Sequence, residues 1–212
     1  MIDLKLAALM SSKLCHDVIG PVGAVSNGIE LMQDEGNEDM REQALELVSQ
    51  SAREASARLQ FYRLAFGLAG GRGPEVSVRE ARNLCREFMS YGKVAFTWPD
   101  DAGGAENLPK DVIKILCNMV VLAGGALPRG GELSIDGTVS GSDWSFTYTA
   151  QGTRAGLREE VTTALLNGYD DDALTAQNVG TYYIMALVEN TGAKLEIVRM
   201  DESEVVLSVR AS

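Results

Sequence analysis

Two long stripes of apolar residues in the first third of the chain limit the folds that it can adopt. The first stripe begins at Leu14 and returns every three or four residues as far as Met32. The second runs in the same way from Met40 to Phe66. This spacing is that of one face of an α-helix, and the polar segment 34–37 marks a turn between the stripes. The sequence therefore predicts an antiparallel hairpin of two helices, each about 27–30 residues and roughly 40–45 Å long.

One hairpin cannot bury both stripes well by itself. Two hairpins packed as a four-helix bundle can bury them, so we expect a homodimer. The alternative is that the stripes pack on the rest of the same chain.

The remainder of the chain alternates between helical and strand patterns. The glycine-rich segment 67–74 is typical of a linker, which predicts a hairpin domain over residues 1–70 and a second domain over 75–212. In the second domain the patterns predict helices over 78–90, with Ser77 as the cap, and over 110–123, 157–166 and 174–190. They predict strands over 93–98, 132–139, 144–150, 194–200 and 204–210. Helices mixed with antiparallel strands in this order favour a two-layer α+β sandwich.

Composition excludes several classes of function. There are 30 acidic and 19 basic residues, a net charge of -11, which argues against nucleic-acid or anionic-membrane binding. A single histidine, His16, rules out a multi-histidine metal site. The three scattered cysteines (Cys15, Cys85 and Cys117) and the lack of a signal-peptide pattern predict a cytoplasmic protein. The most apolar run, 112–127, is too short to span a bilayer.

His16 is placed on the outside of the first predicted helix. It lies two residues from both Leu14 and Val18, so it points roughly 160–200° away from the apolar stripe. Its neighbours on that face are mostly small, which leaves room for another protein; they are Ser12, Lys13, Ile19, Gly20 and Gly23. A solvated surface histidine is the plainer interpretation. Pro21 weakens it, because proline inside a helix costs about 3 kcal/mol or more and invites a functional explanation.

The segment from His16 to Val22 resembles the H box of sensor histidine kinases. That box has a histidine, an acidic residue and a proline five residues after the histidine, matched here by His16, Asp17 and Pro21. Its place in a helical hairpin followed by an α+β domain strengthens the match.

The second domain resembles the ATP-binding domain of those kinases but lacks the residues that hold the nucleotide. Asn118 matches the first asparagine of the family's Asn box, and the segment 128–131 keeps its Pro-x-Gly-Gly turn. Leu122 stands where the family binds Mg²⁺, which requires oxygen ligands. Ala150 and Arg154 replace the adenine-binding aspartate and a phosphate-loop glycine. We therefore expect no nucleotide, although an unrelated α+β domain with chance glycine matches is the alternative.

A closer resemblance is to the ChpT family, histidine phosphotransferases of alphaproteobacteria. It rests on segments 14–17, 21–24, 27–31 and 59–67 and extends over nearly the full chain. It implies a dimeric four-helix bundle followed by a degenerate kinase-ATPase-like (Bergerat) sandwich. It also implies a relay from the receiver domain of a hybrid kinase to response regulators of cell-cycle control, with His16 as the phosphorylated residue.

The reaction implied is reversible phosphoryl transfer between a receiver aspartate and His16. The receiver brings its own Mg²⁺, so no cofactor or metal is expected on this chain. Lys13 is expected to steady the phosphoryl oxygens as a point charge, and Asp17 to support His16, although at i+1 it does not share the histidine's face. The expected partner-binding residues are Ser12, Ile19, Gly20, Gly23 and Asn27. The alternatives are a non-catalytic signalling adaptor and an ATP-dependent histidine kinase.

Overall fold

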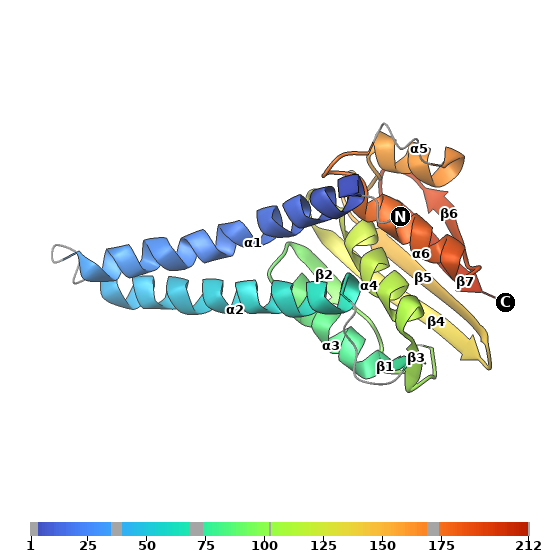
Figure 1. Ribbon diagram of the computed structural model, residues 1–212, viewed down its shortest axis with the longest axis horizontal. Coiled ribbons are helices and arrows are strands. Elements are labelled where there is room, and N and C mark those ends of the chain that lie inside the picture. The colour runs from blue at the N-terminus through green and yellow to red at the C-terminus, as the bar shows by residue number, and fades with distance from the viewer. Residues whose placement is uncertain (1–3, 35–39, 68–73, 102, 169–173, 212) are drawn as a thin grey trace.

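A long helical hairpin projects from an α+β sandwich in the computed structural model (Figure 1). The structure describes residues 4–34, 40–67, 74–101, 103–168 and 174–211. The hairpin consists of α1 (Leu4–Gln33) and α2 (Arg41–Ala65), as the two stripes predict. Residues 35–37 of the expected turn and 68–73 of the expected linker lie outside the described residues.

Helix α1 continues without interruption through Pro21. It packs tightly on α2 at Gly28, which is buried. A Cβ atom at Gly28 would lie 2.6 Å from Val48 Cγ2 and 3.1 Å from the carbonyl oxygen of Ala44. Only a residue without a side chain lets the two helices approach this closely.

The chain from Glu75 to Ala211 forms the expected α+β fold. Its helices are α3 (Val78–Met89), α4 (Lys110–Gly124), α5 (Glu159–Asn167) and α6 (Val179–Asn190). Its strands are β1 (Glu75–Ser77), β2 (Val94–Thr97), β3 (Asn107–Pro109), β4 (Gly131–Ser140), β5 (Asp143–Gln151), β6 (Lys194–Met200) and β7 (Glu204–Ala211). Ser77 caps α3 as expected, since its Oγ accepts a hydrogen bond from the backbone N–H of Glu80.

The sheet differs from the expectation in one pairing. Its order is β2-β4-β5-β7-β6, and all pairs are antiparallel except β2 with β4, which is parallel. The expected antiparallel strands are thus found in three of the four pairs of this sheet, and the parallel pair was not predicted. The chain passes from β2 through β3 and α4 before it enters β4, and such a crossover connection returns it in the same direction.

Two further details were not predicted. Strands β1 and β3 form a separate two-stranded sheet, with three residues each. Helix α6 begins at Val179 rather than at 174, because the segment before it makes a turn in which Asn178 Oδ1 accepts a hydrogen bond from the N–H of Thr175 at 2.8 Å.

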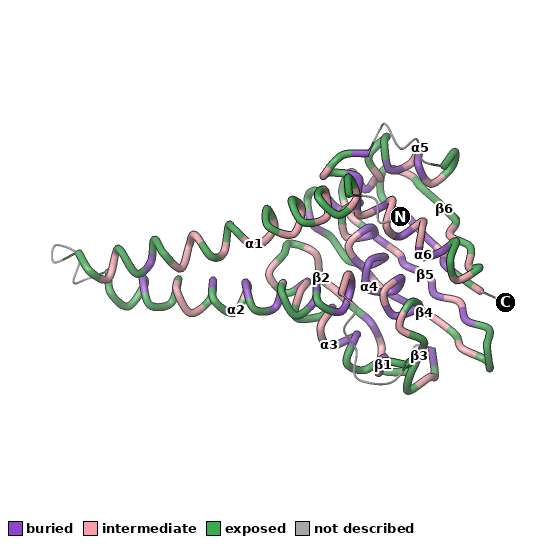
Figure 2. The backbone as a smooth tube through the Cα atoms, viewed as in Figure 1, coloured by how far each residue is buried: buried purple, intermediate pink, exposed green. Residues whose placement is uncertain are grey.

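The core lies where α3, α4 and α6 cover one face of the sheet, and Figure 2 shows the buried residues concentrated there. The last turns of α2 join this core through Phe61, Tyr62, Leu64 and Ala65. Asn118 of α4 fastens them, since its Nδ2 donates to the carbonyl oxygen of Ala65 at 2.9 Å. The end of α2 is thus fixed on the sandwich, whereas most of the hairpin projects away from it.

Candidate phosphotransfer site

His16 projects from α1 into solvent, with 87% of its side chain exposed. Four of the five residues expected to bind a partner are exposed as well: Ser12, Ile19, Gly20 and Asn27. The fifth, Gly23, is half-buried, but a Cβ atom at Gly23 or at Gly20 would have no atom within 4 Å. The surface around His16 is therefore open along its own helix.

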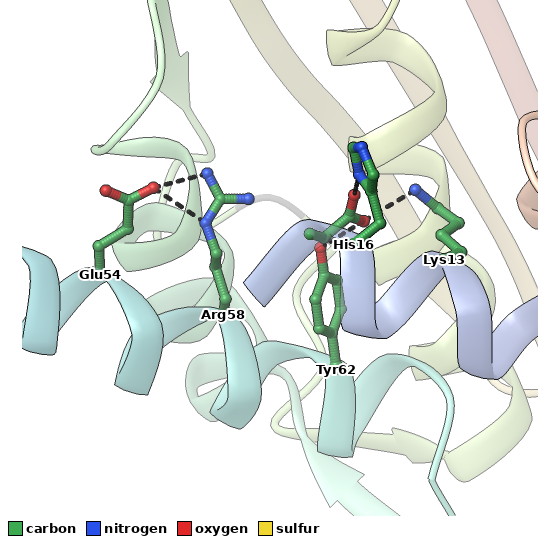
Figure 3. Close-up of polar contacts among 6 residues, drawn as sticks. Lys13, His16, Glu54, Arg58 and Tyr62 are labelled. Carbon is green, nitrogen blue, oxygen red and sulfur yellow. Dashed lines mark hydrogen bonds and ion pairs between the residues drawn. The ribbon is translucent and has the colours of Figure 1, made fainter. Parts of the chain in front are cut away.

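Asp17 is the shared partner in the polar contacts beside His16, and Figure 3 shows how Lys13, His16 and Tyr62 lie around it. Its Oδ2 accepts hydrogen bonds from Lys13 Nζ and from the hydroxyl of Tyr62, each at 2.9 Å. Its Oδ1 lies 3.4 Å from Nδ1 of His16. The structure thus brings Lys13, His16 and Asp17 together, with the Lys13 ammonium on the carboxylate of Asp17.

Two parts of this arrangement differ from what the sequence suggested. The i+1 spacing placed Asp17 away from the face of His16, but both side chains bend toward each other across the helix surface. Tyr62 falls within the apolar stripe of the second helix and within segment 59–67 of the family resemblance, and neither gives it a role beside His16. Its hydroxyl reaches Asp17 from 45 residues away in the sequence, and a helical stripe carries no signal of such a contact.

The carboxyl group of Asp17 is held ionised by its partners. Burial by itself would raise its pKa. The hydrogen bond and charge of Lys13, followed by the hydrogen bonds of Tyr62 and His16, outweigh burial and lower the pKa below the ordinary value of 3.8. At neutral pH this carboxylate can therefore only accept hydrogen bonds.

The shifted pKa of Asp17 predicts how stability depends on pH. Because its pKa is lower in the folded chain than the ordinary 3.8, the charge stabilises the fold above that pH, and this contribution is lost as the pH falls through the folded value. We expect Asp17→Asn to lower the melting temperature near pH 7, and the difference from wild type to shrink below pH 3.8. Thermal unfolding of both proteins from pH 7 to 3 measures it. A difference that stays constant or grows at low pH would contradict the assignment.

A small cavity is lined in part by Asn118 and Leu122, two positions that the resemblance to the kinases matches to their nucleotide site. It has a volume of about 90 Å³, against roughly 300–1,000 Å³ for typical small-molecule sites. Lys13 of α1, Leu122 of α4 and Thr181 of α6 contribute to its lining. Asn118 also reaches it, but its Nδ2 is hydrogen-bonded to the carbonyl oxygens of Ala65 and Lys114.

The other replaced positions have structural roles. Ala150 is fully buried in β5. Arg154, at the place of a phosphate-loop glycine, has a φ of 58°, the left-handed region that glycine adopts most easily. A residue with a long side chain thus stands here in a backbone conformation that glycine adopts more easily.

Within the described ranges, no group of three or more histidine, cysteine, aspartate or glutamate side chains is placed to hold a metal ion. In the same part of the chain, no helix is both long and apolar enough to cross a membrane.

Comparison with known proteins identifies the class. The family model for the histidine phosphotransferase C-terminal domain matches residues 78–203. The chain is 38% identical over 194 residues to "Protein phosphotransferase ChpT" of Brucella abortus (strain 2308), which covers 92% of this chain and 90% of that protein. A solved bacterial phosphotransferase superposes with a TM-score of 0.86 at 35% identity, covering 99% of this chain and 97% of the other. The histidine kinase AdeS of Acinetobacter baumannii aligns over 93% of this chain and 97% of its own, with a TM-score of 0.48 and 11% identity.

The chain therefore belongs to the histidine phosphotransferase family, and it is a phosphotransferase. The resemblance to the ChpT family on which the sequence analysis rested is confirmed.

Proposed function

We propose that this chain relays a phosphoryl group through His16 between aspartates of receiver domains, from a hybrid histidine kinase to response regulators. The observation that carries the proposal is the setting of its single histidine. The ring is 87% exposed, and its Nδ1 faces the carboxylate of Asp17. The cell-cycle role and the cytoplasmic location implied by the sequence belong to the same proposal.

The geometry supports Nε2 as the attacking atom. Since the Asp17 carboxylate only accepts, a hydrogen bond with His16 requires a proton on Nδ1, which leaves the lone pair on Nε2. In the transfer, Nε2 bonds to phosphorus in line as the bond from phosphorus to the receiver's aspartate oxygen breaks, and that electron pair stays on the receiver's carboxylate. Asp17 then balances the positive charge on the imidazole. Catalysis consists mainly of positioning and charge stabilisation.

The other groups that contact the phosphoryl group come from both proteins. The receiver supplies Mg²⁺, and this chain binds no cofactor of its own. Lys13 lies one turn before His16, and its ammonium donates to the carboxylate of Asp17 beside the imidazole. This position supports its assignment as the contact for phosphoryl oxygens. The docking surface is formed by five residues of α1, of which Gly23 is half-buried and the others are exposed; they are Ser12, Ile19, Gly20, Gly23 and Asn27.

The proposed functional unit is a homodimer. In a single chain the hairpin exposes apolar residues at multiples of seven: Val22 and Ile29 on α1 lie seven residues apart, and Leu45 and Leu59 on α2 lie 14 residues apart, which is two seven-residue repeats. Leu45 and Leu59 are each 56% exposed. Seven-residue spacing on neighbouring helices is the pattern that packs helices into bundles, and a second copy of this hairpin supplies the matching stripes.

An ATP-dependent kinase is the weaker alternative. The cavity is small, Leu122 lines it, and Ala150 offers no side-chain acceptor for adenine. The adaptor alternative gives His16 no chemical role.

The test is transfer of radiolabel to the chain from a phosphorylated receiver domain, with Mg²⁺ and without ATP. We expect acid-labile label on the wild type and none on His16→Ala, with circular dichroism showing that the variant is folded. A parallel incubation with labelled ATP alone should leave the chain unlabelled. Equal labelling of His16→Ala, or no label on the wild type from a panel of receivers, would favour the adaptor; label from ATP would favour the kinase.

A further inference from the structure

A tyrosine of the second helix contacts the carboxylate beside His16. Asp17 divides its two oxygens: Oδ2 takes the hydrogen bonds of Lys13 and Tyr62, and Oδ1 faces Nδ1 of His16. With two donors on one oxygen, the plane of the carboxylate is fixed, and the other oxygen is directed at the imidazole. Figure 3 shows Tyr62 and Lys13 converging on this group from different helices.

Tyr62 is the rigid member of the two donors. Lys13 belongs to the same helix as Asp17, and its ammonium ends a flexible four-carbon chain. The ring of Tyr62 is 7% exposed and packs against three aromatic rings, those of Phe61, Phe66 and Phe88, at centroid distances of 5.8, 5.7 and 5.8 Å. Phe88 belongs to α3, so this packing ties the hydroxyl to the sandwich. Burial, and after it the charge of Asp17, raises the pKa of Tyr62, which keeps the hydroxyl a donor throughout the range of an activity assay.

His16 needs such a fixed point. Its side chain is largely in solvent, and within the described part of the chain it has a polar side-chain contact with Asp17. We propose that Tyr62 is a positioning residue for phosphoryl transfer, which acts through Asp17 to hold the His16 imidazole with Nδ1 protonated and Nε2 turned toward the receiver. This inference rests on the proposed function and adds a residue of α2 to a site otherwise built from α1.

The variant that tests it is Tyr62→Phe, which removes the hydroxyl and keeps the ring in its aromatic cluster. We expect the rate of transfer to fall about three- to tenfold, while the KM for the receiver stays unchanged, because docking occurs on α1. Tyr183→Phe is the matched control. Tyr183 is half-buried on α6, and its ring also packs on Phe66, so its loss of a hydroxyl should leave the transfer rate unchanged.

A double variant separates positioning from a general effect on packing. If Tyr62 acts through Asp17, Tyr62→Phe combined with Asp17→Asn should transfer no more slowly than Asp17→Asn alone. A purely structural role would instead lower the rate further in the double variant.

Nitrogen-15 NMR measures how the imidazole proton is distributed between Nδ1 and Nε2. Because the protein has one histidine, the imidazole signals need no residue assignment. At a pH where the ring is neutral, we expect the wild type and Tyr183→Phe to carry the proton mainly on Nδ1, and Tyr62→Phe to shift it toward Nε2. A transfer rate and proton distribution in Tyr62→Phe equal to those of wild type would overturn the inference and leave the proposed function intact. Failure of the relay itself appears separately, as label on His16→Ala or none on wild type, and the NMR comparison stands without it.

Discussion

Replacing Gly23 with leucine is expected to slow phosphoryl transfer from a receiver by about a hundredfold while the chain stays folded. Gly23 lies on α1 two turns after His16, and a Cβ atom there would meet nothing within 4 Å. A leucine side chain is therefore accommodated by the chain itself and projects into the space that the receiver must occupy. A displacement of about 1 Å at the reacting atoms can cost 10²-fold in rate, so a side chain that keeps the receiver off the helix should have at least this effect.

Gly28→Leu is the matched control on the same helix. A Cβ atom at Gly28 already lies 2.6 Å from Val48 Cγ2, so this variant should lose transfer through loss of folding, with a markedly lower melting temperature. Single-turnover transfer rates, melting curves and sedimentation of the two variants separate blocked docking from disrupted packing. Unchanged transfer by Gly23→Leu would remove this face of α1 from the docking surface.

The second large effect is expected on assembly. Leu45→Glu together with Leu59→Glu should convert a dimer at micromolar concentration into a monomer. Both leucines are exposed in a single chain, so the charges cost little there, whereas burying unpaired carboxylates in a four-helix bundle is strongly unfavourable. Analytical ultracentrifugation of the wild type and the double variant measures the change.

Leu166→Glu is the control for this experiment. Leu166 is 68% exposed but lies on α5, outside the hairpin, so this variant should sediment as the wild type does. A wild type that is monomeric at micromolar concentration, or a double variant that remains dimeric, would show that these exposed apolar residues do not form a dimer interface.

The sequence predicted the elements of the fold more fully than their pairing. The two helices of the hairpin, the cap at Ser77 and strands β4 to β7 follow from local periodicity and turn residues. The parallel pairing of β2 with β4 depends on the crossover connection through β3 and α4, which places β4 beside β2 in the same direction. No local sequence pattern specifies this pairing. Strands β1 and β3 are too short, at three residues each, to show an alternation.

The site, like the fold, has features that local sequence predicts and contacts that depend on packing. The exposure of His16 follows from its angle to the apolar stripe, and the unsuitability of Leu122 for Mg²⁺ follows from its chemistry. The i,i+4 spacing is compatible with the pair of Lys13 and Asp17, but the contacts of Asp17 with His16 and Tyr62 could not be predicted from local spacing. Its approach to His16 depends on side-chain torsions, and the bond from Tyr62 depends on how α2 packs beside α1.

The most direct test of the relay is to follow the phosphoryl group out of the chain. Purified protein labelled on His16 is mixed with a second, unphosphorylated receiver domain and Mg²⁺, without ATP, and both proteins are followed over time. The relay predicts that acid-labile label leaves His16 at the rate at which label appears on the receiver's aspartate, and that an aspartate-to-alanine receiver leaves His16 labelled. Label that stays on His16 with every receiver offered, or a receiver that gains label equally in the presence of His16→Ala, would contradict it.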